Sequence, residues 1–141
     1  MSGLLRQATC VAIHGRGLLI EGRPDSGKSS LALALIDRGA VLVGDDGVAL
    51  EVRGGRIWAL PAPATRGLIE IRNVGIVEMP STEAPVCLLV TLDEAAPRFV
   101  EAAGKTAIAG CAVPSLALWP DSPVLALRAE AALARYGLPP A

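Results

Sequence analysis

Apolar residues along the chain gather in short runs, and one of these runs leads directly into a glycine-rich turn. Residues 18–20, Leu-Leu-Ile, are typical of a buried strand, and the turn at residues 22–29 follows them. An apolar pattern with helical spacing then runs from about Lys28 to Arg38, where Gly39 is a typical helix terminator. The sequence therefore predicts a strand, a glycine loop and a helix in direct succession.

Short strands separated by turns are predicted on both sides of this unit. Residues 9–13 and 18–21 form one expected hairpin, and residues 48–52 and 56–60 flank a Gly-Gly turn as a second. The other segments are, in order, a strand at 41–43, a proline-rich loop at 61–65, an alternating charged strand at 68–78, a strand at 86–92, a loop with a short helix at 93–110, and irregular structure or an edge strand at 113–120. Many short strands with few helices predict an α/β fold with a mixed β-sheet core and flanking helices.

A last helix is predicted from its start and stop signals. Asp121 or Ser122 would cap this helix, and Pro123 would occupy its first position. Gly137 and Pro139 would end it. Its buried apolar stripe is expected to consist of Val124, Leu127, Ala131 and Ala134.

The turn at residues 22–29 matches the phosphate-loop pattern G-x-x-x-x-G-K-[ST]. Gly22 and Gly27 would let several backbone N–H groups point at one phosphate, and the helix start adds its positive dipole end. In this pattern Lys28 reaches the β- and γ-phosphates of a nucleotide, and the Ser29 hydroxyl ligates Mg²⁺. The simpler interpretation is an ordinary glycine-rich turn before a helix. The predicted nucleotide-binding residues are Gly22, Arg23, Pro24, Asp25, Ser26, Gly27, Lys28, Ser29 and Ser30.

Two adjacent acids, Asp45 and Asp46, follow the strand that comes after the loop helix. In phosphate-loop proteins a strand-end carboxylate near the loop serves Mg²⁺ or orients a nucleophile. Two acids side by side suggest one for each task. The alternative is a solvated Gly-Asp-Asp-Gly turn.

Other charged residues carry weaker signals. Glu70 and Arg72 occupy alternate positions of an expected strand and would share a face. That arrangement fits metal and phosphate recognition, and equally a surface ion pair. Arg98 follows Pro97 in an expected loop and His14 lies in an expected turn, so both are by themselves typical of exposed residues.

Composition narrows the class of protein. The length of 141 residues suits one domain, expected over residues 1–141, and 52% hydrophobic with 19% charged residues indicates a globular chain. A net charge of -1 without a basic stripe argues against nucleic acid as a partner. No apolar run approaches the ~20 residues that span a bilayer, and no signal peptide is recognised, so no membrane partner is expected. The scattered Cys10, Cys87 and Cys111 predict reduced, buried thiols in a cytoplasmic protein.

Taken together, these stretches resemble the catalytic domain of HPr kinase/phosphorylase. The resemblance rests on GRPDSGKSSLALALIDRGAVLVGDD followed by LIEIRNVGIVEM, and it extends from about Gln7 to Leu133. The chain is similar to the short single-domain form of alphaproteobacteria. The resemblance implies a fold akin to phosphoenolpyruvate carboxykinase. It also implies ATP- and Mg²⁺-dependent phosphorylation of a serine of the phosphocarrier protein HPr, phosphorolysis as the reverse reaction, and a homo-oligomer, often a hexamer.

The same resemblance implies roles for single residues. Lys28 matches the loop lysine, and Ser29 and Glu70 match two Mg²⁺ ligands. Asp45 matches the catalytic aspartate, the base of the forward reaction and the acid of the reverse. Arg98 matches a catalytic arginine.

Two further roles come from the mechanism that we expect for such a site. Asp46 would orient Asp45 or a metal-bound water. Arg72 is a second candidate, beside Arg98, for neutralising charge on the transferred group.

The chain departs from the family pattern in three places. Gln7 stands where counting back from Gly22 places the family's catalytic histidine, and an amide cannot become a cation or transfer a proton. Residues 113–116 lack the arginines of the loop that longer members use in dephosphorylation. Residues 23–25 read Arg-Pro-Asp, and Ser30 stands where an acid is common. The first two departures argue against phosphorolysis.

Two other functions are compatible with the sequence. A phosphate-loop kinase of a small molecule would have a deep, closed pocket beside Asp45, whereas a protein substrate calls for an open face. A non-catalytic nucleotide-sensing module, suggested by Gln7, would bind ATP and transfer nothing.

Overall fold

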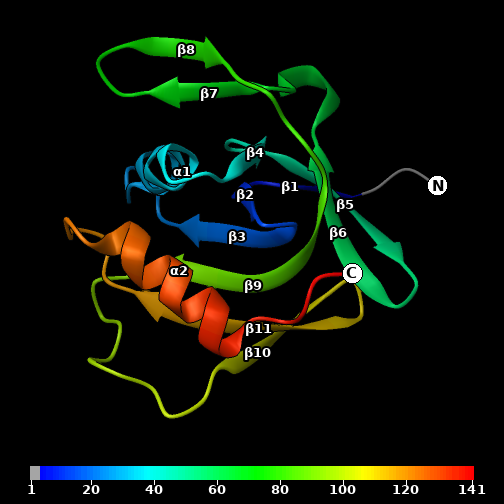
Figure 1. The fold of residues 1–141 in the computed structure, drawn as a ribbon, viewed down its shortest axis with the longest axis vertical. Helices are drawn as coiled ribbons and strands as arrows, with labels where there is room; N and C mark the ends of the chain where they lie inside the picture. The colour runs from blue at the N-terminus through cyan, green and yellow to red at the C-terminus, as the bar shows by residue number, and fades with distance from the viewer. Residues whose placement is uncertain (1–3) are drawn as a thin grey trace.

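Strand β9 (Ala84–Leu92) lies in the middle of a nine-stranded mixed sheet. In the computed structural model, which describes residues 4–141, β9 pairs in parallel with β3 (Arg16–Gly22) along one edge. Along its other edge it pairs first with β6 (Arg56–Pro61), antiparallel, and then with β11 (Cys111–Leu118), in parallel. Two strands, β6 and β11, therefore share one edge of β9, and the sheet branches there (Figure 1).

The remaining elements surround this centre. The strand order along the sheet is β1-β5-β6-β9-β3-β2-β4, and β10 pairs with β11. Their bounds are β1 (Leu4–Arg6), β2 (Thr9–Ile13), β4 (Val41–Gly44), β5 (Val48–Arg53), β10 (Gly104–Ile108), α1 (Lys28–Asp37), α2 (Leu125–Tyr136) and the 3-10 turn η1 (Pro63–Thr65). Strands β7 (Leu68–Ile71) and β8 (Gly75–Glu78) form a separate two-stranded sheet. The predicted α/β fold with a mixed sheet is confirmed.

Two hydrophobic cores lie on the two faces of the central strands. Leu18 and Ile20 of β3 face the core that α1 and α2 share, while Leu19 faces the opposite core with Leu89. The alternation follows from strand geometry, because successive side chains point to opposite faces. Both helices thus cover one face of the sheet. The β7–β8 hairpin packs on the other side of α1, above this helix in the view of Figure 1. Among residues 4–141, no helix is both long enough and apolar enough to cross a membrane.

The segment after β9 differs from its prediction. Residues 93–103 form a loop without the expected short helix, and residues 104–108 form strand β10. The Asp93 carboxylate accepts a hydrogen bond from the Ala95 N–H at 2.8 Å, and this local turn replaces the first turn of a helix. The prediction of a short helix was wrong because Pro97 has no N–H to donate to the Asp93 carbonyl, so this turn cannot continue as a helix.

Strand β11 is neither irregular nor at the edge of the sheet. It pairs with β10 on one side and with β9 on the other. Pro114 lies just before Ser115, where the ladder with β9 begins, so its missing N–H does not interrupt that ladder. The prediction of irregular structure or an edge strand, which was based on Pro114, was therefore wrong.

Residues 68–78 form a hairpin and not one continuous strand. Asn73 and Gly75 have φ of 69° and 124°, and the Val74 N–H donates to the carbonyl of Ile71 at 2.9 Å. Residues with left-handed backbone close the tight turn between β7 and β8. Arg72 lies in this turn, so it does not share a strand face with Glu70.

Helix α2 buries the face opposite to the one predicted. Val124 and Leu127 are 38% and 47% exposed, and Ala131 and Ala134 are exposed as well. The buried residues are Leu125, Ala129, Ala132 and Leu133. Alanine and leucine occur on both sides of this helix, so periodicity alone could not choose the buried side.

The start of α2 was also misplaced. The helix begins at Leu125 and Pro123 lies before it. The Ser122 hydroxyl accepts a hydrogen bond from the Val124 N–H at 3.1 Å, so the serine stabilises the turn that leads into the helix.

Candidate functional site

The glycine loop joins the end of β3 to the start of α1, as the sequence predicts. A Cβ on Gly22 would lie 3.2 Å from the carbonyl oxygen of Leu92 and 2.5 Å from the Ser26 hydroxyl, so a larger residue would displace that hydroxyl and crowd Leu92. Gly27 caps the helix with φ of 100°, a conformation that favours glycine. Gly27 is therefore favoured by its backbone conformation, and Gly22 by the close approach of Ser26 and Leu92.

Two polar groups of the loop suit an anion. Lys28 Nζ donates to the carbonyls of Gly22 and Arg23 at 3.0 and 3.1 Å, which holds the ammonium group against the loop backbone. The Ser26 hydroxyl is buried and has no hydrogen-bond partner among the described residues. An ammonium group, a buried hydroxyl without a partner and the N-terminus of α1 together fit the phosphates of a nucleotide.

Asp45 is buried at the end of β4, only 8% exposed. Its Oδ1 accepts hydrogen bonds from the hydroxyls of Ser29 at 2.6 Å and Thr9 at 3.1 Å. Its Oδ2 accepts one from the backbone N–H of Glu70 at 3.0 Å. Donors from α1, β2 and β7 thus fix one carboxylate, and Asp45 is not part of a solvated turn.

Asp46 has a different environment. Its side chain is exposed, and its backbone has φ of 59°. Its N–H donates to the Thr9 hydroxyl at 3.2 Å. The two acids therefore differ in burial: Asp45 is fixed and Asp46 is accessible.

The donor set at the loop suits Mg²⁺ bound mainly through phosphate. Ser29 lies within hydrogen-bond distance of Asp45, and the backbone of Glu70 contacts the same carboxylate while its side chain is exposed. Among the described residues, no group of three or more His, Cys, Asp or Glu side chains could hold a metal ion by itself. Mg²⁺ commonly uses one or two carboxylates together with substrate phosphates, so these residues fit that ion.

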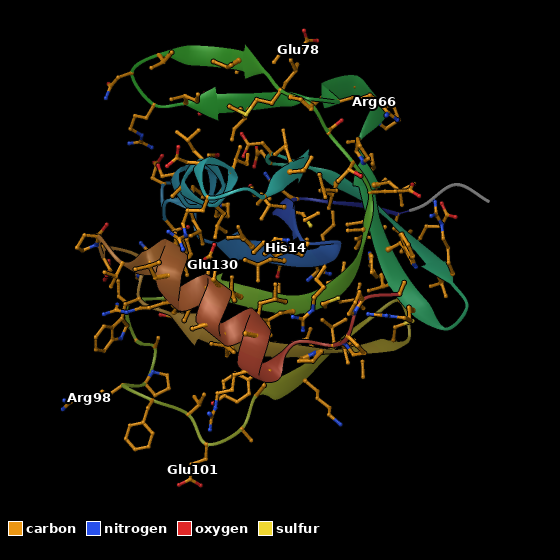
Figure 2. The ribbon with its side chains drawn as sticks, in the orientation of Figure 1. His14, Arg66, Glu78, Arg98, Glu101 and Glu130 are labelled. Carbon is orange, nitrogen blue, oxygen red and sulfur yellow. The ribbon has the colours of Figure 1, made fainter. Side chains whose placement is uncertain are left out.

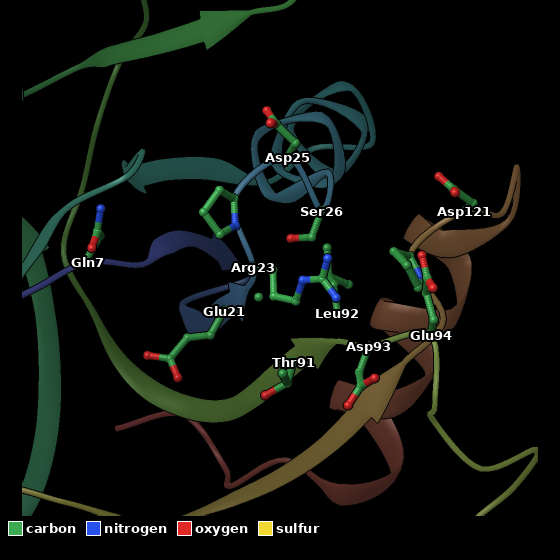
Figure 3. A pocket seen from close by; sticks show the side chains of 13 residues that line it. Gln7, Glu21, Arg23, Asp25, Ser26, Thr91, Leu92, Asp93, Glu94 and Asp121 are labelled. Atoms are coloured by element: carbon green, nitrogen blue, oxygen red, sulfur yellow. The ribbon is translucent and has the colours of Figure 1, made fainter.

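A cavity of about 630 Å³ lies beside the loop. In the view of Figure 3, Gln7 and Glu21 lie on one side of the loop, and Asp93, Glu94 and Asp121 lie on the other. A second cavity of about 380 Å³ lies against the start of α1 and the start of α2, and its lining includes Ser30 and Arg72. Residues 120–121, with Asp25 and Ser26, contribute to both cavities.

Gln7 is exposed, follows β1 and lines the larger cavity. The preceding residue, Arg6, makes a bidentate ion pair with Glu21, the residue before the loop. This pair ties the end of β1 to the end of β3 at the cavity. The sequence analysis predicted neither β1 nor this ion pair, because a short strand with two exposed leucines has no clear pattern.

Three other charged residues that the sequence singled out lie farther from Asp45 and Ser29 or at the surface: Arg72, Arg98 and His14. Arg72 donates to the Asp25 carboxylate at 3.2 Å, and both side chains are exposed. Arg98 is exposed on the loop after β9, lines neither cavity and points away from the molecule in Figure 2. His14 lies in the turn at the opposite end of β3 from the phosphate loop, roughly 20 Å away for a strand of this length.

The three cysteines line neither cavity beside the loop. Cys10 and Cys87 are buried and Cys111 is half-buried, and all three are unbonded thiols. Burial raises the pKa of the Cys10 thiol well above its ordinary value. The expectation of reduced cysteines agrees with these positions, although Cys111 is not fully buried.

Comparison with known proteins agrees with this geometry. A family model described as the HPr Serine kinase C-terminal domain matches residues 4–82. HPr kinase/phosphorylase of Clostridium tetani is 41% identical over 71 residues, and that of Streptococcus thermophilus is 44% identical over 72 residues. Each match covers 50% of this chain but 23% of the relative, so the chain matches about a quarter of the length of these relatives. The solved HPr(Ser) kinase/phosphatase of Coxiella burnetii superposes with a TM-score of 0.82 at 26% identity, covering 93% of this chain and 94% of that one.

Proposed function

Because the chain belongs to the HPr serine kinase C-terminal domain family, we propose that it transfers the γ-phosphate of ATP to a serine of an HPr-like phosphocarrier protein. The observation that carries this proposal is the 2.6 Å hydrogen bond between Ser29 of the phosphate loop and Asp45, the residue after β4. It joins the group that binds nucleotide to the group that acts on the acceptor.

The phosphate loop would bind the nucleotide. Backbone N–H groups of residues 22–29 and the ammonium group of Lys28 would hold the β- and γ-phosphates. Ser29 and Glu70 would hold Mg²⁺, which neutralises charge on those phosphates when it is bound. The two residues are linked through Asp45, whose carboxylate accepts hydrogen bonds from the Ser29 hydroxyl and the Glu70 N–H, while the Glu70 side chain is exposed.

Asp45 would accept the proton of the acceptor serine. A carboxylate offers about four lone-pair positions, and three described donors occupy three of them, two on Oδ1 and one on Oδ2. One position on Oδ2 is left for the serine hydroxyl. General-base help of this kind contributes ~10²–10⁴-fold to a rate. Asp46 would orient a water or the metal ion from its exposed position.

Charge on the transferred group would be neutralised by arginine. Arg72 is the better placed of the two candidates, because it already contacts Asp25 of the loop. Arg98 would reach the site only if the loop of residues 93–103 moved toward it.

The forward reaction is the one that these residues favour. Gln7 lines the cavity where the resemblance places the family's catalytic histidine, and its amide can form hydrogen bonds but cannot carry a charge or transfer a proton. We therefore place the serine kinase activity first and expect weak phosphorolysis.

A protein substrate fits the site better than a small molecule. Asp45 lines neither of the two cavities beside the loop, which favours an acceptor that approaches over an open face. The larger cavity supplies space of ligand size next to the loop, which is the one observation in favour of a small acceptor.

The setting of the reaction follows from the family. A cytoplasmic enzyme is consistent with three unbonded thiols, and a homo-oligomer, often a hexamer in this family, is the assembly we expect. Light scattering on the purified protein measures that assembly directly.

The decisive experiment is incubation with ATP, Mg²⁺ and purified HPr, followed by mass spectrometry for phosphoserine. HPr with its acceptor serine changed to alanine is the control. ATP binding without any transfer would favour the nucleotide-sensing module. In that case the variant Gln7→His should gain activity.

A further inference from the structure

Thr9 is completely buried at the start of β2, with 0% of its surface exposed. Thr9 and Asp45 are the two buried polar or charged residues among residues 4–141, and they are bonded to each other. A valine has nearly the same shape and would occupy this position without the cost of burying a hydroxyl. The hydroxyl therefore calls for an explanation beyond packing.

The Thr9 hydroxyl bridges the two acids. It donates to Asp45 Oδ1 at 3.1 Å and accepts the N–H of Asp46 at 3.2 Å. A hydroxyl has a single proton to donate, and here that proton goes to the carboxylate. The same oxygen thus fixes the side chain of one acid and the backbone of the next.

The location of Thr9 makes this bridge rigid. Strand β2 is paired on both sides, with β3 and with β4, and Thr9 itself lies opposite Ile20. A β-branched side chain in a strand has restricted χ1 rotation, so the hydroxyl cannot easily turn away. Asp46 has φ of 59°, a conformation that needs support in a residue other than glycine.

We propose that Thr9 is a positioning residue of the phosphate-transfer site, which orients the Asp45 carboxylate toward Ser29 and holds the backbone of Asp46 in its turn. This inference rests on the proposed function, since it concerns the same two acids. Because Thr9 is completely buried, it would act through Asp45 and Asp46 and not by contacting nucleotide or acceptor. Ser29 supplies the second donor to Oδ1, so the two hydroxyls together define the plane of the carboxylate.

The test compares Thr9→Val, which removes the hydroxyl and keeps the shape, with Thr9→Ser, which keeps the hydroxyl. Thr9→Val should lower kcat for HPr phosphorylation about tenfold or more while KM for ATP stays within about twofold. Thr9→Ser should recover most of kcat. A general loss of folded protein would instead lower apparent activity and thermal stability together, so melting curves accompany the kinetics.

The control is Thr106→Val, which removes a partly buried hydroxyl that is bonded to Ser115 in the β10–β11 ladder, away from the loop. Its kcat should equal that of the unmodified protein. Thr9→Ala, which also lacks the hydroxyl, is the second variant if Thr9→Val does not fold. An unchanged kcat in the folded variant, or a Thr9→Ser as poor as Thr9→Val, would overturn the inference.

Failure of the proposed function is distinguishable from failure of this inference. If the unmodified protein transfers no phosphate to HPr, the proposed function fails, and a crystal structure of Thr9→Val then decides about Thr9. The inference expects the Asp45 carboxylate to turn away from Ser29 in that structure. A carboxylate that keeps its place beside Ser29 would overturn it.

Discussion

The hydroxyl of Ser29 and the carboxylate of Asp45 lie 2.6 Å apart, although one lies in the first turn of helix α1 and the other follows strand β4. This hydrogen bond connects the nucleotide loop directly to the acid pair. It forms because α1 packs against β4 and β2 across one face of the sheet. Residues that would bind phosphate and accept a proton are thereby held together by the core itself.

We expect Asp45→Asn to bind ATP with nearly unchanged affinity and to lose phosphate transfer by ~10²–10⁴-fold, because an amide cannot accept the proton of serine. Calorimetry measures the binding, and a phosphoserine assay measures the transfer. Asp37→Asn, an exposed acid at the end of α1, is the matched control and should behave like the unmodified protein. Near-normal transfer by Asp45→Asn would remove Asp45 from the role of base.

Lys28→Ala should weaken ATP binding by about tenfold or more, since a charge-assisted contact to phosphate is lost. Titration calorimetry with Mg·ATP is the measurement. Lys105→Ala, which changes the chain's other lysine on the exposed strand β10, should leave the affinity unchanged. Equal affinities for both variants would contradict the assignment of the phosphate loop.

Local signals in the sequence were enough to predict the loop and most strands. Gly22 lies where a side chain would crowd Ser26 and Leu92, and Gly27 has a φ of 100° that favours glycine. The strands at 9–13, 48–52 and 86–92 lie within two residues of their predicted ends. These elements are set by turn chemistry and by alternation within a few neighbouring residues. They depend little on the rest of the fold.

Choices that depend on distant contacts could not be predicted. The buried side of α2 is selected by the sheet, because both sides of the helix carry apolar residues. In the site, Asp45 was predicted, but its bond to Thr9 spans 36 positions and leaves no periodic signal. The one hint was a threonine within an otherwise apolar strand.

Gly137→Ala should destabilise the protein by about 1–3 kcal/mol, because a methyl group there has no room. A Cβ would lie 2.5 Å from the carbonyl oxygen of Leu133 and 2.9 Å from Arg16 Nη2, although φ of -72° suits any residue. Gly47→Ala is the matched control, since its Cβ would meet nothing within 4 Å and its φ is not positive. Chemical denaturation that finds equal stability for the two variants would refute this account of the α2 end.

The cysteines should differ in reactivity and contribute a pH dependence to stability. In the folded protein iodoacetamide should modify Cys111 first, and Cys10 should react only on unfolding, since burial raises the pKa of the Cys10 thiol and excludes the reagent.

A thiol with a raised folded-state pKa contributes stability that is complete below its unfolded pKa of about 8.5 and is lost as pH rises above that value. The free energy of unfolding should therefore fall above about pH 8.5, and the variant Cys10→Ala should show a smaller fall over the same range. Mass spectrometry of labelled peptides and denaturation at several pH values test both parts. Early labelling of Cys10 in the folded protein would contradict the prediction.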